Sequence, residues 1–436
     1  MADRPNFLYV FTDQQSIRAL SCSGNRWINT PHMDRLAAGG IRFERSYCTS
    51  PVCTPSRASH VTSRMPYEIG VQWNDLAIPS RFPTMGDVFR NAGYYTIWSG
   101  KWHVPKSYPD PKKGEFIRGF DYLNMPDGIQ HLGIGDNVDG IATDMACNWL
   151  TQVAPRLDQP WVMGLSLHNP HDICGWTWRQ PVKSQRQNDF PPLPDNHLSR
   201  HDDIDFLRIC RERNHYGNEN QSAMKWEPDH WRAYLNEYAQ LTQQVDNLIG
   251  RVLDALDRGG WSDNTVVIFT SDHGEGMAEH YWVVKLFFWE SIVSVPMIVR
   301  YPGSIPAGAV NASHLVSGLD ILPTMCDYAG IDPLDEFRGV SLRQAIENPS
   351  NAGRDYIVTE LAPDPKDQSL QGRMVRSLRY KYCVFNRGEN REMLFDLESD
   401  PGEMNNRAKD GSMKTVLDTH RGYLRDFMTQ TSDAFA

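Results

Sequence analysis

Cys53 is the first residue in this sequence whose neighbours suggest a chemical role. It opens the segment Cys53-Thr-Pro-Ser-Arg57. Pro55 suits the first turn of a helix, where its missing N–H costs nothing, so the side chain of Cys53 is expected at a helix N-terminus. Such a terminus attracts anions. The short pattern is equally compatible with a buried thiol in front of a helix, so other segments have to decide.

Polar clusters follow four short apolar runs that have the composition of strands covered on both faces. In open α/β sheets, ligands bind beyond the carboxyl ends of the strands, so these clusters are expected to converge on one site. The four runs are Asn6–Thr12, Tyr95–Trp98, Trp161–Leu167 and Thr265–Thr270.

Two of these strand ends carry metal-ligand types. Asp13-Gln14 and Asp272-His273 offer carboxylate, amide and imidazole donors, which suit a divalent cation such as Ca²⁺, Mg²⁺ or Mn²⁺. Each pair alone is weak, because an aspartate at a strand end often bonds local backbone instead.

Three further segments carry histidine, and two of them also carry lysine. Gly100-Lys-Trp-His103 follows the second run, His168-Asn-Pro-His171 follows the third, and Lys285 stands five residues after His280. The Gly100–His103 segment could instead consist of a surface lysine and a packed histidine. With a formal net charge of −10, however, any anion must be held by a local cluster of this kind.

Together and in this order, the five motifs resemble those of the type I, formylglycine-dependent sulfatases of the alkaline-phosphatase-like superfamily. Cys53-x-Pro-x-Arg57 is similar to the sequence read by the enzymes that oxidise cysteine to formylglycine. The resemblance runs from Asn6 to about Ala408 and includes Leu394-Phe-Asp-Leu-Glu-Ser-Asp-Pro-Gly-Glu403.

The resemblance implies that residue 53 becomes formylglycine (3-oxoalanine) after a transient encounter with a formylglycine-generating enzyme. Its hydrate would attack sulfur and form a sulfated enzyme. Asp13, Gln14, Asp272, His273 and residue 53 would hold one divalent cation, with Ca²⁺ preferred and Mg²⁺ or Mn²⁺ as alternatives. Gln14 and His273 depart from the Asp-Asp and Asp-Asn pairs of many relatives, although both are found within the superfamily.

The same resemblance implies roles for five more catalytic residues. Lys101 and Lys285 would neutralise the sulfate oxygens, and Arg57 would hold the hydrate or contact sulfate. His103 would deprotonate the second hydroxyl of the hydrate, so that the aldehyde returns and sulfate leaves. His171, preferred over His168, would protonate the departing alcohol.

Substrate recognition is the least specified part. His168 and His280 are expected to contact the substrate, which we expect to be a sulfated sugar. Aromatic rings on an insertion at about residues 174–229 could stack against sugar faces or serve as ordinary packing residues, and Trp176 is the first candidate. The tryptophans in or near this insertion are Trp176, Trp178, Trp226 and Trp231.

The elements predict an α/β fold with a large, mostly parallel central sheet flanked by helices. One helix has apolar residues at helical spacing from Trp231 to Leu256 and ends at Gly259-Gly260. Residues 1–350 are expected to form the catalytic domain. Residues 351–436 are expected to form a small α+β subdomain, with an antiparallel sheet around Met374–Phe385 and a final helix.

The composition also bears on the partners, the membrane association and the compartment that we expect. The acidic balance argues against nucleic acid as a partner, and no apolar run is long enough to cross a bilayer. The eight cysteines show no paired spacing and are expected to be mostly reduced core thiols. The first residues lack a secretion signal, so we expect a cytoplasmic protein, or a periplasmic or secreted one if a leader precedes them. The oligomeric state is left open.

Three alternative functions remain at this point. A phosphate or phosphonate monoester hydrolase of the same superfamily would share Gln14 and His273, but Lys101 in Gly-Lys-Trp-His argues against it. The segment from His168 to Gly175 faintly resembles that of N-sulfoglucosamine hydrolases, which cleave S–N bonds. An inactive protein that binds sulfated glycans is the third, although every catalytic position carries a competent residue.

Overall fold

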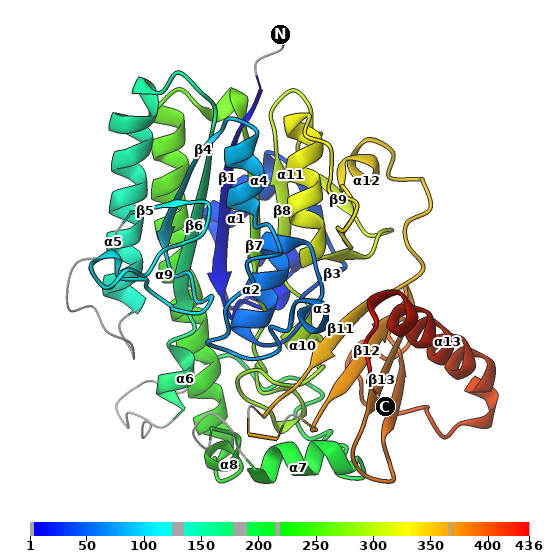
Figure 1. The fold of residues 1–436 in the computed structure, drawn as a ribbon. Coiled ribbons are helices and arrows are strands. Elements are labelled where there is room, and N and C mark those ends of the chain that lie inside the picture. The colour runs from blue at the N-terminus through cyan, green and yellow to red at the C-terminus, as the bar shows by residue number, and fades with distance from the viewer. Residues whose placement is uncertain are drawn as a thin grey trace.

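The computed structural model describes residues 4–123, 135–177, 190–213, 219–364, 366–367 and 369–435. Its centre is an eight-stranded sheet in the order β5-β4-β6-β1-β7-β8-β2-β9 (Figure 1). Among these strands β8 alone runs against the others, because its pairings with β7 and β2 are antiparallel. The strands are β1 (Asn6–Asp13), β2 (Ile41–Phe43), β4 (Tyr95–Gly100), β5 (Asp121–Leu123), β6 (Trp161–Pro170), β7 (Thr265–Ser271), β8 (Met297–Arg300) and β9 (Ala309–Asn311).

Helices cover both faces of this sheet. Successive side chains of a strand point to opposite faces, and all of β1 is buried. Phe7, Tyr9 and Phe11 therefore pack with α2, α4 and α11. Leu8 and Val10 pack with α1, α5 and α9 on the other face. These helices are α1 (Pro31–Ala38), α2 (Cys53–Thr62), α4 (Met85–Asn91), α5 (Gly135–Asn148), α9 (Pro228–Arg258) and α11 (Ile321–Ala329).

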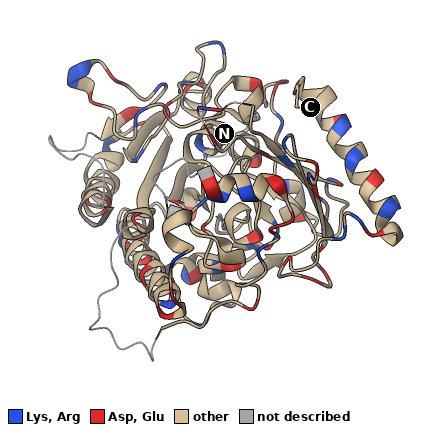
Figure 2. Ribbon diagram, turned by 90° about the horizontal axis from the view of Figure 1, so that it is seen from below, with Lys and Arg blue, Asp and Glu red and all other residues tan. Residues whose placement is uncertain are grey.

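A second sheet lies towards the C-terminus, in the antiparallel order β11-β12-β13-β14. One face packs on α13, where Val375 contacts the cluster that contains Leu424. The other face packs on the main domain, where Phe385 stacks on Phe287 with ring centroids 5.5 Å apart. Figure 2 shows basic and acidic residues interspersed along α13. These elements are β11 (Ile357–Leu361), β12 (Gly372–Arg376), β13 (Tyr380–Phe385), β14 (Glu392–Asp396) and α13 (Lys414–Thr431).

The predicted fold class is confirmed, and all four predicted strands and the long helix are present. The proposed division after residue 350 falls between α12 and β11 and stays a prediction. No helix among the described residues is both long and apolar enough to span a membrane. The remaining elements are β3 (Ser46–Tyr47), β10 (Val316–Ser317), α3 (Pro66–Ile69), α6 (Ile173–Trp176), α7 (Asp205–Arg213), α8 (Glu219–Ala223), α10 (Glu290–Val293) and α12 (Arg343–Glu347).

Candidate active site

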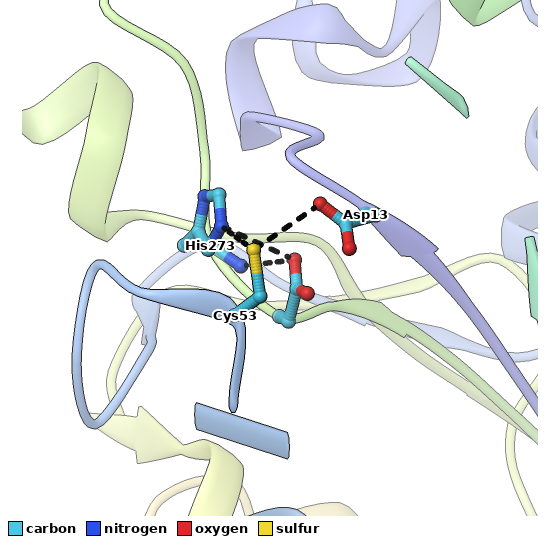
Figure 3. Close-up of side chains that lie close together, drawn as sticks. Asp13, Cys53 and His273 are labelled. Atoms are coloured by element: carbon cyan, nitrogen blue, oxygen red, sulfur yellow. Dashed lines mark hydrogen bonds and ion pairs between the residues drawn. The ribbon is translucent and has the colours of Figure 1, made fainter. Parts of the chain in front are cut away.

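Four predicted site residues meet where β1 and β7 end and α2 begins. Asp13 is the last residue of β1, Asp272 follows β7, and Cys53 is the first residue of α2. Ligand atoms of these three residues and His273 all lie within 4.8 Å of one another, and all four side chains are buried. The Cys53 Sγ lies 3.3 Å from His273 Nε2 and 3.7 Å from Asp13 Oδ1 (Figure 3).

Arg57 joins the two aspartates. It follows Cys53 by four residues in α2, so both side chains lie on one face of the helix. Its Nη2 donates to Asp13 Oδ2 at 2.8 Å and its Nε donates to Asp272 Oδ2 at 2.7 Å. Its Nη1 donates to Ser166 Oγ at 2.9 Å. Every nitrogen of the guanidinium thus meets a protein oxygen, so Arg57 orients the carboxylates. Its expected contact with the hydrate or with sulfate stays a prediction.

The two predicted lysines add positive charge from distant parts of the chain. Lys101 Nζ lies 2.7 Å from Asp13 Oδ2, and Lys285 Nζ donates to Cys53 Sγ at 2.9 Å. Burial would raise the pKa of Asp13, but Lys101, His171 and Arg57 together lower it well below its ordinary value. Burial would lower the pKa of Lys285. The neighbouring Cys53, Cys174 and Asp13 nevertheless raise this pKa well above its ordinary value. The carboxylate and the ammonium are therefore both charged.

Gly100 allows the turn that brings Lys101 into the site. Its φ of +84° is a left-handed conformation, and a Cβ at this position would lie 2.1 Å from the Ser166 carbonyl oxygen. The Lys101 N–H donates to that same oxygen at 3.0 Å. Only glycine fits both the backbone angle and the close approach of β4 to β6.

An irregularity at the end of β6 presents His171. Thr12 pairs with Leu167, but the next residue of β1 pairs with Pro170, so two extra residues stand out from the strand. Their N–H groups both donate to the buried carboxylate of Asp139, at 2.5 and 2.8 Å. Asp139 was not predicted from the sequence, because nothing local links α5 to this strand end.

The histidines on this segment differ in their surroundings. His171 Nε2 lies 4.0 Å from Asp13 Oδ1. Burial, Lys101 and Lys285 hold the pKa of His171 well below its ordinary value, so the ring is neutral. His168 lies beside it and is held by the Tyr108 hydroxyl, 3.1 Å from Nδ1. His171 therefore faces the cluster, and its preferred role as the acid stays a prediction.

His103 lies against the first turn of α2. The Thr54 hydroxyl donates to the His103 carbonyl at 2.6 Å. The His103 Nε2 lies 3.7 Å from an Asp75 oxygen. The His103 Nδ1 is buried and has no hydrogen-bond partner among the described residues. A ring nitrogen is thus left available next to the helix that carries Cys53.

His280 and two of the four tryptophans, Trp226 and Trp231, are packed in the interior of the protein. The His280 ring is buried, donates through Nδ1 to the Ser199 carbonyl at 2.8 Å and accepts from Asn196 at Nε2. It also stacks on Trp289, so it offers no free atom to a substrate. Trp231 is fully buried in a helix-packing cluster that also contains Trp226. Trp176 remains partly exposed at the edge of that cluster, and Trp178 lies outside the described residues.

Gln14 is held by a carboxylate that the sequence did not reveal. Its Nε2 donates to Glu275 Oε2 at 2.5 Å, and its backbone N–H donates to Asp272 Oδ1 at 3.0 Å. Burial raises the pKa of Glu275, against the hydrogen bonds that lower it. In the sequence, the only local indication of a role for Glu275 was its position directly after Asp272-His-Gly274.

The donors suit a hard divalent cation. His273 Nδ1 donates to the Gly274 carbonyl at 2.9 Å, which leaves the Nε2 lone pair for a ligand bond. Burial lowers the pKa of His273, so the ring is neutral, as a ligand must be. Asp13 and Asp272 complete a set of two carboxylates and one imidazole within the cluster. The residues present therefore fit the expected cation, without defining which one.

The sheet order and the polar site at the strand ends define an alkaline-phosphatase-like hydrolase. A model of the Sulfatase family matches residues 5–331, well over half of the chain. The chain therefore belongs to the sulfatase family and is a hydrolase of sulfate esters. A second model, described as N-sulphoglucosamine sulphohydrolase, C-terminal, matches residues 278–430.

Individual relatives cover nearly the whole chain. A Delta 4,5-hexuronate-2-O-sulfatase of Bacteroides thetaiotaomicron is 30% identical over 99% of this chain and 90% of its own length. The structure of a 2-O GAG sulfatase is 28% identical, with a TM-score of 0.84 over 99% of this chain and 94% of that one. A phosphonate monoester hydrolase of Agrobacterium radiobacter has a TM-score of 0.81 over 98% of this chain and 96% of its own, at 23% identity, which shows a common fold alone.

Proposed function

We propose that this sulfatase removes sulfate from a sulfated carbohydrate, with formylglycine at position 53 and one divalent cation bound by the Asp13, Asp272 and His273 cluster. The relatives named for hexuronate and GAG sulfate esters support the carbohydrate substrate. The formylglycine-generating enzyme is the partner that this modification requires.

The observation that carries the proposal is the setting of the Cys53 thiol. Its sulfur lies among a carboxylate, an imidazole and an ammonium group at the start of α2. Other buried cysteines, such as Cys326 and Cys383, lie in apolar clusters instead. A purely structural thiol has no need of three polar neighbours, whereas a reacting group does.

Formylglycine, the cation and the protein side chains have different roles in the proposed reaction. Formylglycine supplies a hydrated aldehyde as nucleophile towards sulfur, and the cation supplies Lewis acidity next to it. Lys101 and Lys285 are the cations that we assign to the sulfate oxygens, where charge develops in the transition state. His103, with its unpartnered Nδ1, is the base that we assign to the release of sulfate.

His171 is the acid that we assign to the departing alcohol. Its pKa is depressed partly by Lys101 and Lys285. An anionic substrate between those lysines offsets their charge and favours the protonated imidazole. The histidine is then able to donate its proton to the alkoxide as the ester bond breaks.

A panel of substrates tests this function. Protein co-produced with a formylglycine-generating enzyme is incubated with sulfated mono- and disaccharides, including 2-O-sulfated unsaturated hexuronates and glucosamine N-sulfate, and sulfate release is measured. Nitrophenyl sulfate, nitrophenyl phosphate and a phosphonate ester are run alongside. We expect O-sulfate release from a sugar and none from Cys53→Ala. Faster cleavage of the phosphonate ester would favour the phosphonate hydrolase instead, and release from glucosamine N-sulfate alone would favour the S–N hydrolase.

A further inference from the structure

Glu275 occupies a buried position directly behind the cation-binding cluster. Its Oε1 accepts hydrogen bonds from the Tyr234 hydroxyl and from the backbone N–H groups of Gly276 and Val284. Its Oε2 accepts from Gln14 Nε2 at 2.5 Å. All four hydrogen-bond partners of the Glu275 carboxylate are donors, and none is an acceptor. An ionised carboxylate suits this environment, because it can only accept hydrogen bonds.

Hydrogen bonds hold the backbone of Gln14, and its side-chain amide can in principle lie in either of two orientations. Its backbone N–H donates to Asp272 Oδ1, and its backbone carbonyl accepts a hydrogen bond from the Tyr238 hydroxyl at 2.8 Å. The two ends of the amide are chemically opposite, because Oε1 can bind a cation and the NH₂ group cannot. The Cys174 sulfur lies 3.2 Å from Nε2 and 3.4 Å from Oε1, so this weak partner does not select an orientation. The Glu275 carboxylate does, because it accepts only from the NH₂ end.

We propose that Glu275 is a positioning residue for the divalent cation: it binds the Gln14 NH₂ group and thereby keeps Gln14 Oε1 as the end of the amide that serves the metal. This inference rests on the proposed cation site. It goes beyond that site by assigning cation affinity to a residue that does not itself touch the metal.

The variant Glu275→Gln reverses the hydrogen-bond pattern. The new side chain has one oxygen, and the N–H groups of Gly276 and Val284 hold that oxygen in place of Oε1. Its NH₂ group then faces Gln14, whose own amide must turn over to present an oxygen to it. The Gln14 NH₂ group is thereby directed towards the cation. We expect cation affinity to fall roughly 10- to 100-fold, as is typical for a lost outer-shell partner.

A compensating substitution separates orientation from mere structural support. Gln14→Glu alone sets two carboxylates at hydrogen-bonding distance and is expected to weaken the cation site. In the double variant Glu275→Gln/Gln14→Glu, the new carboxylate has an oxygen at both ends. One oxygen accepts from the amide introduced at position 275 and the other faces the cation. We therefore expect the second substitution to restore the affinity that the first removes.

The experiment is a calorimetric titration of Ca²⁺ and of Mn²⁺ into the chelator-treated full chain. Glu360→Gln is the matched control, because Glu360 is also a buried glutamate whose Oε2 accepts a backbone N–H, from Tyr67 on α3. We expect wild type and Glu360→Gln to bind alike, Glu275→Gln to bind weakly, and the double variant to recover. Thermal unfolding without cation checks that each variant is folded.

The outcomes separate this inference from the proposed function. Equal cation affinity in wild type and Glu275→Gln would overturn the role of Glu275 alone. A weakened Glu275→Gln that Gln14→Glu fails to rescue would also overturn it, in favour of a general packing role. Absence of cation binding in the wild type would overturn the cation site itself and this inference with it.

Discussion

At the scale of single residues, the site depends on how opposite charges are paired inside the protein. Arg57 contacts one oxygen of Asp13 and one of Asp272 and is itself buried against the Phe11 ring. This leaves one oxygen of each aspartate directed to the cluster. Removing one partner of such a buried network leaves an uncompensated charge, which costs far more than the loss of a surface pair.

Arg57→Lys tests this pairing. A lysine keeps the charge but lacks the fork that reaches both aspartates. We expect a loss of about 1–3 kcal/mol in the free energy of unfolding, because a buried carboxylate oxygen loses its hydrogen bond, together with weaker cation binding. Urea unfolding in the presence of a chelator measures the first. Arg35→Lys, at an exposed pair with Asp254, is the control and is expected to change stability by less than about 1 kcal/mol. Equal losses in both variants would contradict the buried clamp.

At the scale of elements, backbone conformation places the site residues. The turn after β4 places Lys101 in the site, and the extra residues at the end of β6 place His171 there. The first turn of α2 places Cys53 there. Each device depends on contact between neighbouring segments. A change in the backbone should therefore affect activity even where no catalytic side chain is altered.

Gly100→Ala is the corresponding prediction. The left-handed backbone costs an alanine about 1–2 kcal/mol, and the contact with the Ser166 carbonyl adds to this. We expect a lower Tm and a large loss of sulfate release. Gly330→Ala is the control, because Gly330 also has a positive φ but nothing lies within 4 Å of a Cβ there. If the control lost as much activity, displacement of Lys101 would not be the cause.

The same scale explains what the sequence could predict. Strands such as Asn6–Thr12 are recognisable because their apolar runs are local, and the polar residues after them follow the general rule for parallel sheets. The role of Arg57 as a clamp, the contact of Glu275 with Gln14 and the burial of His280 could not be predicted. Each depends on side chains that are far apart in the sequence and meet only in the folded protein. The reversed strand β8 is short, and its direction is likewise set by tertiary pairing.

At the scale of the whole molecule, the C-terminal sheet is tied to the main domain by buried polar groups. Lys381 on β13 contacts Glu290 of α10 at 3.2 Å and Glu403 at 2.5 Å. Glu360 on β11 accepts the Tyr67 N–H of α3 at 2.9 Å, and its other oxygen is buried without a partner among the described residues. Burial raises the pKa of Glu360 from 4.5 to about 8.

This pKa predicts a pH-dependent stability. Because the folded-state pKa lies above the unfolded one, Glu360 favours folding most at low pH. This contribution declines as pH rises from about 4.5 and is lost through pH 8. Glu360→Gln mimics the neutral acid at every pH. We expect the variant to gain stability over the wild type between pH 6 and pH 9, on the order of a few kcal/mol. Thermal melts of both proteins at pH 6 and pH 9 measure the difference in stability. A stability that changes with pH in the same way in both proteins would contradict the prediction.

The central claim is that residue 53 does its chemistry as an aldehyde and not as a thiol. Peptide mass spectrometry of active protein, prepared with graded amounts of formylglycine-generating enzyme, tests this most directly when read beside the rate of sulfate release. We predict that the peptide containing residue 53 has lost its sulfur and gained an aldehyde oxygen in proportion to activity. Full activity in a preparation whose Cys53 retains its thiol would contradict the account.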